Sequence, residues 1–217
     1  GERYLKPLSG HEIDHLYRHA SIAAAGINVV VSSDAPYGPL NPWHVIHAAT
    51  ERRTSEGKII GADEGIGYSV SAGQERTMPA WLATAAHVHV NKRTGKITVK
   101  KLWVVSDAGI VIHPDGAMAQ LEGSLLWGLS LALFEHNEVK NGQVSKTNLH
   151  TYLPLRMNDV PEMDIELVES EEFPVGLGEP GVIGVAPAIG NAVYQAIGVR
   201  LRHLPMLAQH VTAALKA

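Results

Sequence analysis

One carboxylate in a stretch with almost nothing else to ionise is the first candidate for chemistry in this sequence. Glu179 lies in the loop GLGEPG at 176–181, among three glycines and a proline, and apolar residues follow. Glycines let a backbone approach a ligand closely, and partial desolvation raises the pKa of a carboxyl group toward working pH. Glu179 is therefore a candidate general base. The alternative from local sequence is a solvated turn residue.

The same loop has the spacing G-x-G-x-x-G, which is typical of dinucleotide-binding turns. That motif requires a hydrophobic strand immediately before it and a helix that opens inside it. Here the polar segment EEFP at 171–174 precedes the loop, and Pro180 interrupts it. We therefore reject a dinucleotide site at this loop.

A second carboxylate, Asp34, follows an expected strand at 27–31, which itself follows an expected helix at 13–25. The strand is a continuous β-branched run that ends in a polar loop, the pattern of a parallel strand covered on both faces. In α/β barrels, catalytic groups collect at the carboxyl ends of such strands. Asp34 is thus a candidate metal ligand, and the alternative is a cap or turn residue before Pro36.

The surroundings of Asp34 resemble the closing strands of an amidohydrolase barrel of the amidohydrolase 3 type, over residues 10–66. The resembling segments are AGINVVVSSDAPYG at 25–38, NPW at 41–43, AATER at 48–52 and GADE at 61–64. The resemblance implies that Asp34 is a metal ligand that helps to activate water. The paired histidines of that family do not precede Asp34, and His87 and His89 follow it, where alternation along a strand explains them more simply. We expect no tightly bound divalent ion at Asp34.

The composition excludes several classes of protein. The 217 residues carry a net charge of -4 and no cysteine. We therefore expect no nucleic-acid partner, no disulfide and no cysteine-ligated iron-sulfur cluster within this chain. No apolar run approaches the roughly 20 residues of a membrane span, and the first residues lack the apolar segment of a signal peptide. We expect a cytoplasmic location.

From residue 67 onward the sequence pattern predicts an α+β unit. Strands at 84–90 and 96–105 are expected to form a hairpin, and apolar residues at helical spacing predict a helix at 115–134, in which Gly123 and Gly128 would allow another backbone to approach. Further expected elements are a hairpin at 138–146 around Asn141 and Gly142, a half-buried strand at 163–168 and a helix at 187–197.

Motifs in this second part resemble the molybdopterin-binding large subunits of the xanthine dehydrogenase and aldehyde oxidase family, particularly the isoquinoline 1-oxidoreductase-like branch. The similarity covers residues 67–206. It rests on AHVHV at 86–90, DAG at 107–109, HPDG at 113–116, QLEG at 120–123, YLPLRM at 152–157, GLGEPG at 176–181, APAIGNA at 186–192 and GVRLR at 198–202. It implies a molybdopterin-binding-domain-like fold with antiparallel strands and two packed helices. We divide the chain into an amidohydrolase-like barrel fragment at 1–66 and a molybdopterin-binding part at 67–217.

By this resemblance, Glu179 is the general base of an oxidative hydroxylation of an N-heterocycle or an aldehyde. Gln120, Gly176 and Gly178 would contact the molybdopterin, which we expect in a dinucleotide form and held mainly by parts of the subunit outside this chain. The implied partners are the other domains of the large subunit, an iron-sulfur electron-transfer subunit and a small-molecule substrate. Two departures are visible: His113 stands where the family usually has Asn, and no cysteine precedes Ala108.

Three functional hypotheses remain at this stage. The first is a part of a molybdenum hydroxylase, inactive as the isolated chain. The second is a metal-dependent amidohydrolase that acts on a C–N bond through Asp34. The third is a fused remnant without catalysis.

Overall fold

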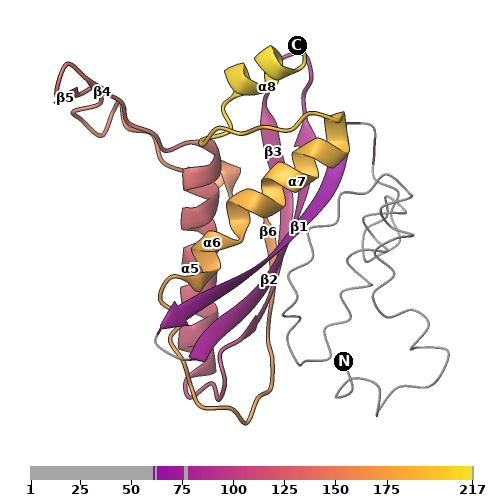
Figure 1. Cartoon of the computed structure of the whole chain (residues 1–217), viewed down its shortest axis with the longest axis vertical. Coiled ribbons are helices and arrows are strands. Elements are labelled where there is room, and N and C mark those ends of the chain that lie inside the picture. The colour runs from indigo at the N-terminus through magenta and orange to yellow at the C-terminus, as the bar shows by residue number, and fades with distance from the viewer. Residues whose placement is uncertain (1–60, 62, 76–77, 217) are drawn as a thin grey trace. The chain divides into compact units, whose positions relative to one another are not determined.

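The computed structural model describes residues 61, 63–75 and 78–216 (Figure 1). Asp34, the helix expected at 13–25 and the strand expected at 27–31 lie outside these residues. The hypotheses that concern them are therefore untested by the structure.

A four-stranded sheet forms the centre of the described part, with strand order β1-β2-β3-β6. β2 runs antiparallel to both β1 and β3, whereas β6 runs parallel to β3. The strand expected at 163–168 joins the main sheet as β6, a parallel pairing that the sequence did not indicate. The bounds are β1 Glu64–Glu75, β2 Met78–Val90, β3 Ile97–Asp107 and β6 Glu162–Leu167.

The hairpin of β2 and β3 confirms the sequence prediction. Its connection is closed by Asn91, whose side-chain oxygen accepts hydrogen bonds from the backbone N–H groups of Arg93 and Thr94. Gly95 has φ +76°, a left-handed conformation that suits glycine. A Cβ there would lie 2.1 Å from the carbonyl oxygen of Ala208.

β1 was not expected from the sequence, because its glycines and small polar residues are weak strand formers. Gly65 and Gly67 lie against helix α7 (Val185–Ile197), where a Cβ on either would approach backbone atoms of Ala192 to 2.1 Å. The predicted domain boundary between residues 66 and 67 falls inside this strand. Two α7 side chains also hold β1: Asn191 donates to the carbonyl oxygen of Tyr68 at 2.9 Å, and Gln195 accepts from the N–H of Ile66 at 2.6 Å.

Helix α5 (Pro114–Leu133) agrees with the helix expected at 115–134 and buries one face in the core through Leu121, Leu125 and Leu129. Gly128 allows close packing, since a Cβ there would lie 2.8 Å from the carbonyl oxygen of Val182. Gly123 does not: no atom lies within 4 Å of its would-be Cβ. Close approach of a neighbouring backbone is therefore confirmed for Gly128 alone.

The C-terminal helices begin earlier than the sequence indicated. A helix start was expected at Pro187, but the four-residue helix α6 (Pro180–Ile183) opens at Pro180, and α7 follows after Gly184. Gly184 lies between the two helices and packs closely against the sheet, since a Cβ there would lie 2.5 Å from Oγ1 of Thr84. A short 3-10 turn at Met157–Asp159 and helix α8 (Ala208–Ala214) were not predicted.

A small hairpin of β4 (Val139–Lys140) and β5 (Gln143–Val144) projects from the body beyond the end of α5 (Figure 1). It confirms the predicted turn at Asn141 and Gly142, whose φ angles are 53° and 77°. Across the described range, no helix combines the length and apolar content needed to cross a membrane.

Candidate functional site

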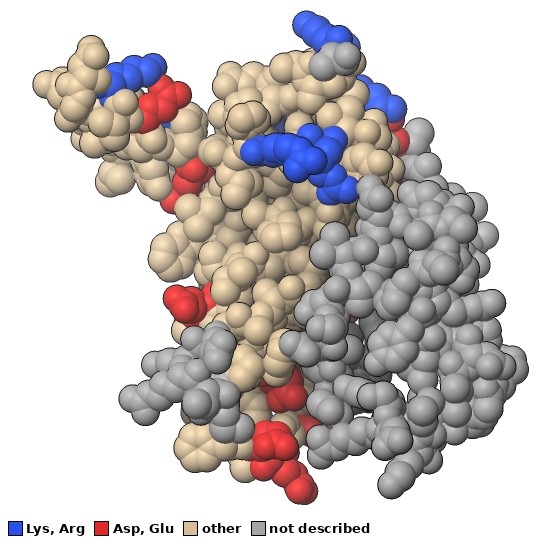
Figure 2. Space-filling view, viewed as in Figure 1, with Lys and Arg blue, Asp and Glu red and all other residues tan. Residues whose placement is uncertain are grey.

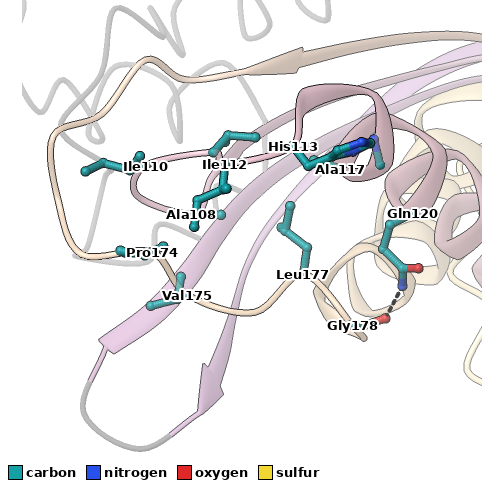
Figure 3. A pocket seen from close by; sticks show the side chains of 12 residues that line it. Ala108, Ile110, Ile112, His113, Ala117, Gln120, Pro174, Val175, Leu177 and Gly178 are labelled. Atoms are coloured by element: carbon teal, nitrogen blue, oxygen red, sulfur yellow. Dashed lines mark hydrogen bonds between the residues drawn. The ribbon is translucent and has the colours of Figure 1, made fainter.

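A pocket of about 380 Å³ opens between the N-terminal end of α5 and the segment at 174–178 (Figure 3). Its walls are mainly apolar, from Ile110, Ile112, Val175 and Leu177. Its polar side chains, His113 and Gln120, come from the start of α5. A mainly apolar cavity with a few convergent polar groups is the usual form of a cofactor or small-molecule site.

Two loop segments far apart in sequence build the apolar walls. The N–H of Val175 donates to the carbonyl oxygen of Ala108 at 2.9 Å, and the N–H of Ile110 donates to that of Glu172 at 3.0 Å. Gly109 lies between Ala108 and Ile110 and has φ +70°. A glycine is required there, since a Cβ would lie 2.3 Å from the carbonyl oxygen of Phe173. The loop that follows β3 is therefore fixed against the segment that leads to Glu179.

Gln120 joins α5 to the glycine-rich loop. Its side-chain amide donates a 2.7 Å hydrogen bond to the carbonyl oxygen of Gly178, the residue before Glu179 (Figure 3). Gly178 also lines the pocket, and no atom lies within 4 Å of its would-be Cβ. The two segments expected to share a cofactor thus meet at one cavity, while their contacts with a cofactor stay a prediction.

His113 has a structural role that the sequence reasoning missed. It is the N-cap of α5, and its Nδ1 accepts a 2.8 Å hydrogen bond from the N–H of Gly116. A neutral imidazole with an accepting Nδ1 carries its proton on Nε2. The sequence did indicate this role, because a polar residue before Pro114 at the first helical position is typical of a helix start.

Glu179 is anchored through its backbone, and its side chain is exposed. Within the described part of the chain, the expectation of partial desolvation was therefore wrong: the loop lies at the surface, and its glycines supply no side chains to cover a carboxylate. The next two residues, Pro180 and Gly181, are buried, and a Cβ on Gly181 would lie 1.9 Å from Oγ of Ser124 on α5. Gly176, also expected at the cofactor, is exposed and is absent from the pocket wall.

His87 of β2 serves the fold through Glu64. Nε2 of His87 lies 3.1 Å from Oε2 of Glu64, and Lys100 bonds the other oxygen of the same carboxylate. Burial alone would raise the pKa of Glu64, but the hydrogen bonds from Lys100 and His87 together hold it below its ordinary value. Among the described residues, no three side chains of His, Asp or Glu gather as a metal site.

Comparison with known proteins identifies the family. The family model of the molybdopterin cofactor-binding domain matches residues 30–161, more than half of the chain. The chain therefore belongs to the molybdopterin cofactor-binding domain family. The matched range includes Asp34, and it ends before Glu179.

Curated relatives and a solved structure are also similar to this chain. The chain is 45% identical over 200 residues to a membrane-bound aldehyde dehydrogenase [pyrroloquinoline-quinone] of Gluconacetobacter polyoxogenes, covering 92% of the chain and 26% of that protein. It is 36% identical over 157 residues to isoquinoline 1-oxidoreductase subunit beta of Brevundimonas diminuta, covering 72% and 20%. Quinoline 2-oxidoreductase of Pseudomonas putida 86 shares the fold, with a TM-score of 0.61 and 24% identity over 65% of the chain and 20% of that structure. The chain thus spans about a quarter or less of these proteins.

Proposed function

We propose that this chain is part of the cofactor-binding subunit of a molybdenum hydroxylase that oxidises an N-heterocycle or an aldehyde. The observation that carries the proposal is the hydrogen bond from Gln120 to Gly178, which unites two distant segments at one pocket. Membership of the molybdopterin cofactor-binding domain family supports the choice of cofactor. The names of the two curated relatives, an aldehyde dehydrogenase and an isoquinoline oxidoreductase, support the two substrate classes.

The pocket suits one end of a pyranopterin. Its volume of about 380 Å³ lies within the usual range for small-molecule sites. An amide side chain both donates and accepts hydrogen bonds, so Gln120 matches the mixed donor and acceptor edge of a pterin. His113 can add a donor from Nε2, and Gly178 leaves space for a ligand to approach the backbone. We expect a dinucleotide form, held mainly by other parts of the subunit.

In this proposal, Glu179 is the general base that accepts the proton of the attacking nucleophile. When bound, the molybdenum cofactor supplies the redox chemistry, and the protein supplies position and a base. The buried residues Pro180 and Gly181 fix the backbone of Glu179, whose side chain makes no capping hydrogen bond to α6. Its side chain does not line the pocket in this chain, so the proposal requires it to turn toward the pocket in the assembled subunit. There it would accept the proton of the water-derived nucleophile that attacks the substrate carbon. Covering by the rest of the subunit would exclude water and make the carboxylate a stronger base.

An iron-sulfur electron-transfer subunit and the other domains of the large subunit complete the proposed enzyme. The chain has no cysteine, so iron-sulfur clusters with cysteine ligands must lie on another polypeptide or domain. The name of the Brevundimonas relative describes a subunit, which supports assembly with partners. We expect the isolated chain to be inactive.

We infer that residues from 30 onward belong to the same cofactor-binding domain. The family model begins at residue 30 and so takes in Asp34 and more than half of the segment that resembles an amidohydrolase. This range favours one domain over a hydrolase fragment joined near residue 66. A hydrolase that acts through Asp34 gains no support from the described residues, because Asp34 lies outside them.

Cofactor content tests the proposal. The chain, produced within its full-length subunit and purified, should contain molybdenum by mass spectrometry and release a fluorescent oxidised pterin. Since the name of the Gluconacetobacter relative gives pyrroloquinoline quinone, the same sample is assayed for that quinone. Stoichiometric molybdenum and pterin without the quinone is the expected result. A sample that contains the quinone but no molybdenum would overturn the proposal. A sample that contains zinc would also overturn it, if the zinc is lost in the variant Asp34→Ala.

A further inference from the structure

The outer face of α5 has a composition that the described fold does not explain. No charged residue occurs between Gly123 and Leu133, and the two serines of this run are buried, so the exposed side chains over the last turns are apolar. A helix that is apolar all round is normally buried all round. Here one side packs on the sheet and α7, while the side chain of Trp127 is 61% exposed and that of Leu131 is 39% exposed.

Gly123 gives an independent sign that a neighbour is missing. Glycine inside a helix costs about 0.5–1 kcal/mol relative to alanine, so it usually has a packing reason. Gly128 shows that reason on the inner face, where a Cβ would meet Val182 at 2.8 Å. On the outer face, nothing lies within 4 Å of a Cβ on Gly123. With Trp127 and Leu131 at successive four-residue intervals, Gly123 forms one surface, which we call the outer stripe.

The outer stripe leads directly to the cofactor pocket. Gln120 and Gly116 lie three and seven residues before Gly123, on the same side of the helix, and both line the pocket. In Figure 2 the side of the molecule formed by α5 shows few charged side chains. A polypeptide on the outer stripe would thus also close the open wall of the pocket.

We propose that the outer stripe is the docking surface for the part of the large subunit that this chain does not match in its relatives. This inference rests on the proposed function, since it names the neighbour of the same site. The chain matches only 26% and 20% of the two curated relatives, so most of such a subunit lies outside it. Gly123 would admit a backbone of that part, and Trp127 would fill a pocket on it.

Co-expression tests the inference. The tagged chain is produced together with a second polypeptide, the part of the Gluconacetobacter relative that the chain does not match. We expect the two to co-purify and the fluorescence of Trp127, obtained by difference from Trp127→Phe, to shift to the blue. Gly123→Leu should lower the recovered partner at least tenfold while leaving the Tm of the chain alone unchanged or raised by about 2–4 °C. The control Leu149→Glu, at an 80% exposed residue beyond β5, should recover normal amounts of the partner.

Three results would overturn the inference. One is full recovery of the partner with both Gly123→Leu and Trp127→Glu. Another is protection of Trp127 from acrylamide quenching in the chain alone, since residues of this chain itself would then cover the outer stripe. The third is concentration-dependent self-association that Gly123→Leu abolishes, since a second copy would then be the occupant. The molybdenum content of the co-purified complex tests the proposed function separately. A complex that depends on Gly123 but contains no molybdenum would contradict the proposed function and still support the docking surface.

Discussion

The side-chain amide of Gln120 donates a 2.7 Å hydrogen bond to the carbonyl oxygen of Gly178. This bond places the residue before Glu179 at the start of α5, beside the pocket wall. It connects the backbone of the proposed base to a helix whose N-terminal end forms the same cavity. The position of Glu179 is therefore fixed from two sides, by Gln120 before it and by the buried Pro180 after it.

Removing this connection should loosen the loop without unfolding the chain. In Gln120→Ala, the carbonyl oxygen of Gly178 loses its donor at an exposed site, so we expect a loss of about 1 kcal/mol or less in unfolding free energy. Hydrogen exchange should rise at 176–179 and stay unchanged in β2 and β3. Unaltered exchange in the loop would show that Gln120 does not hold it. Thr98→Ala, on the exposed face of β3, is the control.

The glycines of the loop should differ sharply in their tolerance of a methyl group. Gly181→Ala would place Cβ 1.9 Å from Oγ of Ser124, so it should destabilise the chain by about 1–3 kcal/mol in urea unfolding. Gly178→Ala meets nothing within 4 Å and should leave stability within about 0.5 kcal/mol. In the loaded subunit, Gly178→Ala should still lower pterin content, because Gly178 lines the pocket. Equal destabilisation by both variants would contradict this packing.

The carboxylate of Glu64 gives the chain an acid-sensitive contribution to stability. Burial raises its folded-state pKa, but hydrogen bonds from Lys100, His87 and the backbone of Gly61, together with the charge of Lys100, bring that pKa below the ordinary value of 4.5. A carboxyl group with a lowered folded pKa stabilises the fold above its unfolded pKa, and this contribution is lost as the pH falls through the folded pKa. Unfolding free energy should therefore fall less steeply below pH 4.5 in Glu64→Gln than in the wild type. The exposed Glu122→Gln is the control, and identical acid limbs for all three chains would refute the prediction.

Asn191 should be more important to β1 than its place in a helix suggests. Its amide donates to the carbonyl oxygen of Tyr68 and accepts from Arg200 at 2.6 Å. Asn191→Ala removes both hydrogen bonds and should cost about 1–3 kcal/mol of unfolding free energy. Hydrogen exchange should rise in β1 before β3. Asn148→Ala, in the exposed region beyond β5, serves as the control.

The sequence predicted the elements whose patterns are local. The hairpin turns at Asn91–Gly95 and Asn141–Gly142 have characteristic turn residues, and the leucines of α5 recur at helical spacing, so each element formed as expected. β1 was missed because its glycines are needed for packing against α7, a contact distant in sequence. β6 was expected as a strand, but its parallel pairing with β3 was not, because alternation indicates a strand without identifying its neighbour.

The site was predictable to a similar extent. Resemblance of motifs led to Gln120 and the glycine-rich loop, which do meet at a pocket. The exposure of Glu179 could not be read from its apolar neighbours, since burial depends on which other segments cover a loop. The role of His113 as the helix cap was missed, because serine, threonine, aspartate and asparagine are the usual N-cap residues.

The turnover of Glu179→Gln in the full-length subunit, assembled with its electron-transfer partners, tests the central claim most directly. Glutamine keeps the size of the side chain and removes its ability to accept a proton at working pH. The variant should retain wild-type molybdenum and pterin content while its kcat for an aldehyde or N-heterocycle falls by about 10²- to 10⁴-fold, the usual contribution of a general base. A kcat within a few-fold of the wild type, at equal cofactor content, would contradict the role of Glu179 as the base.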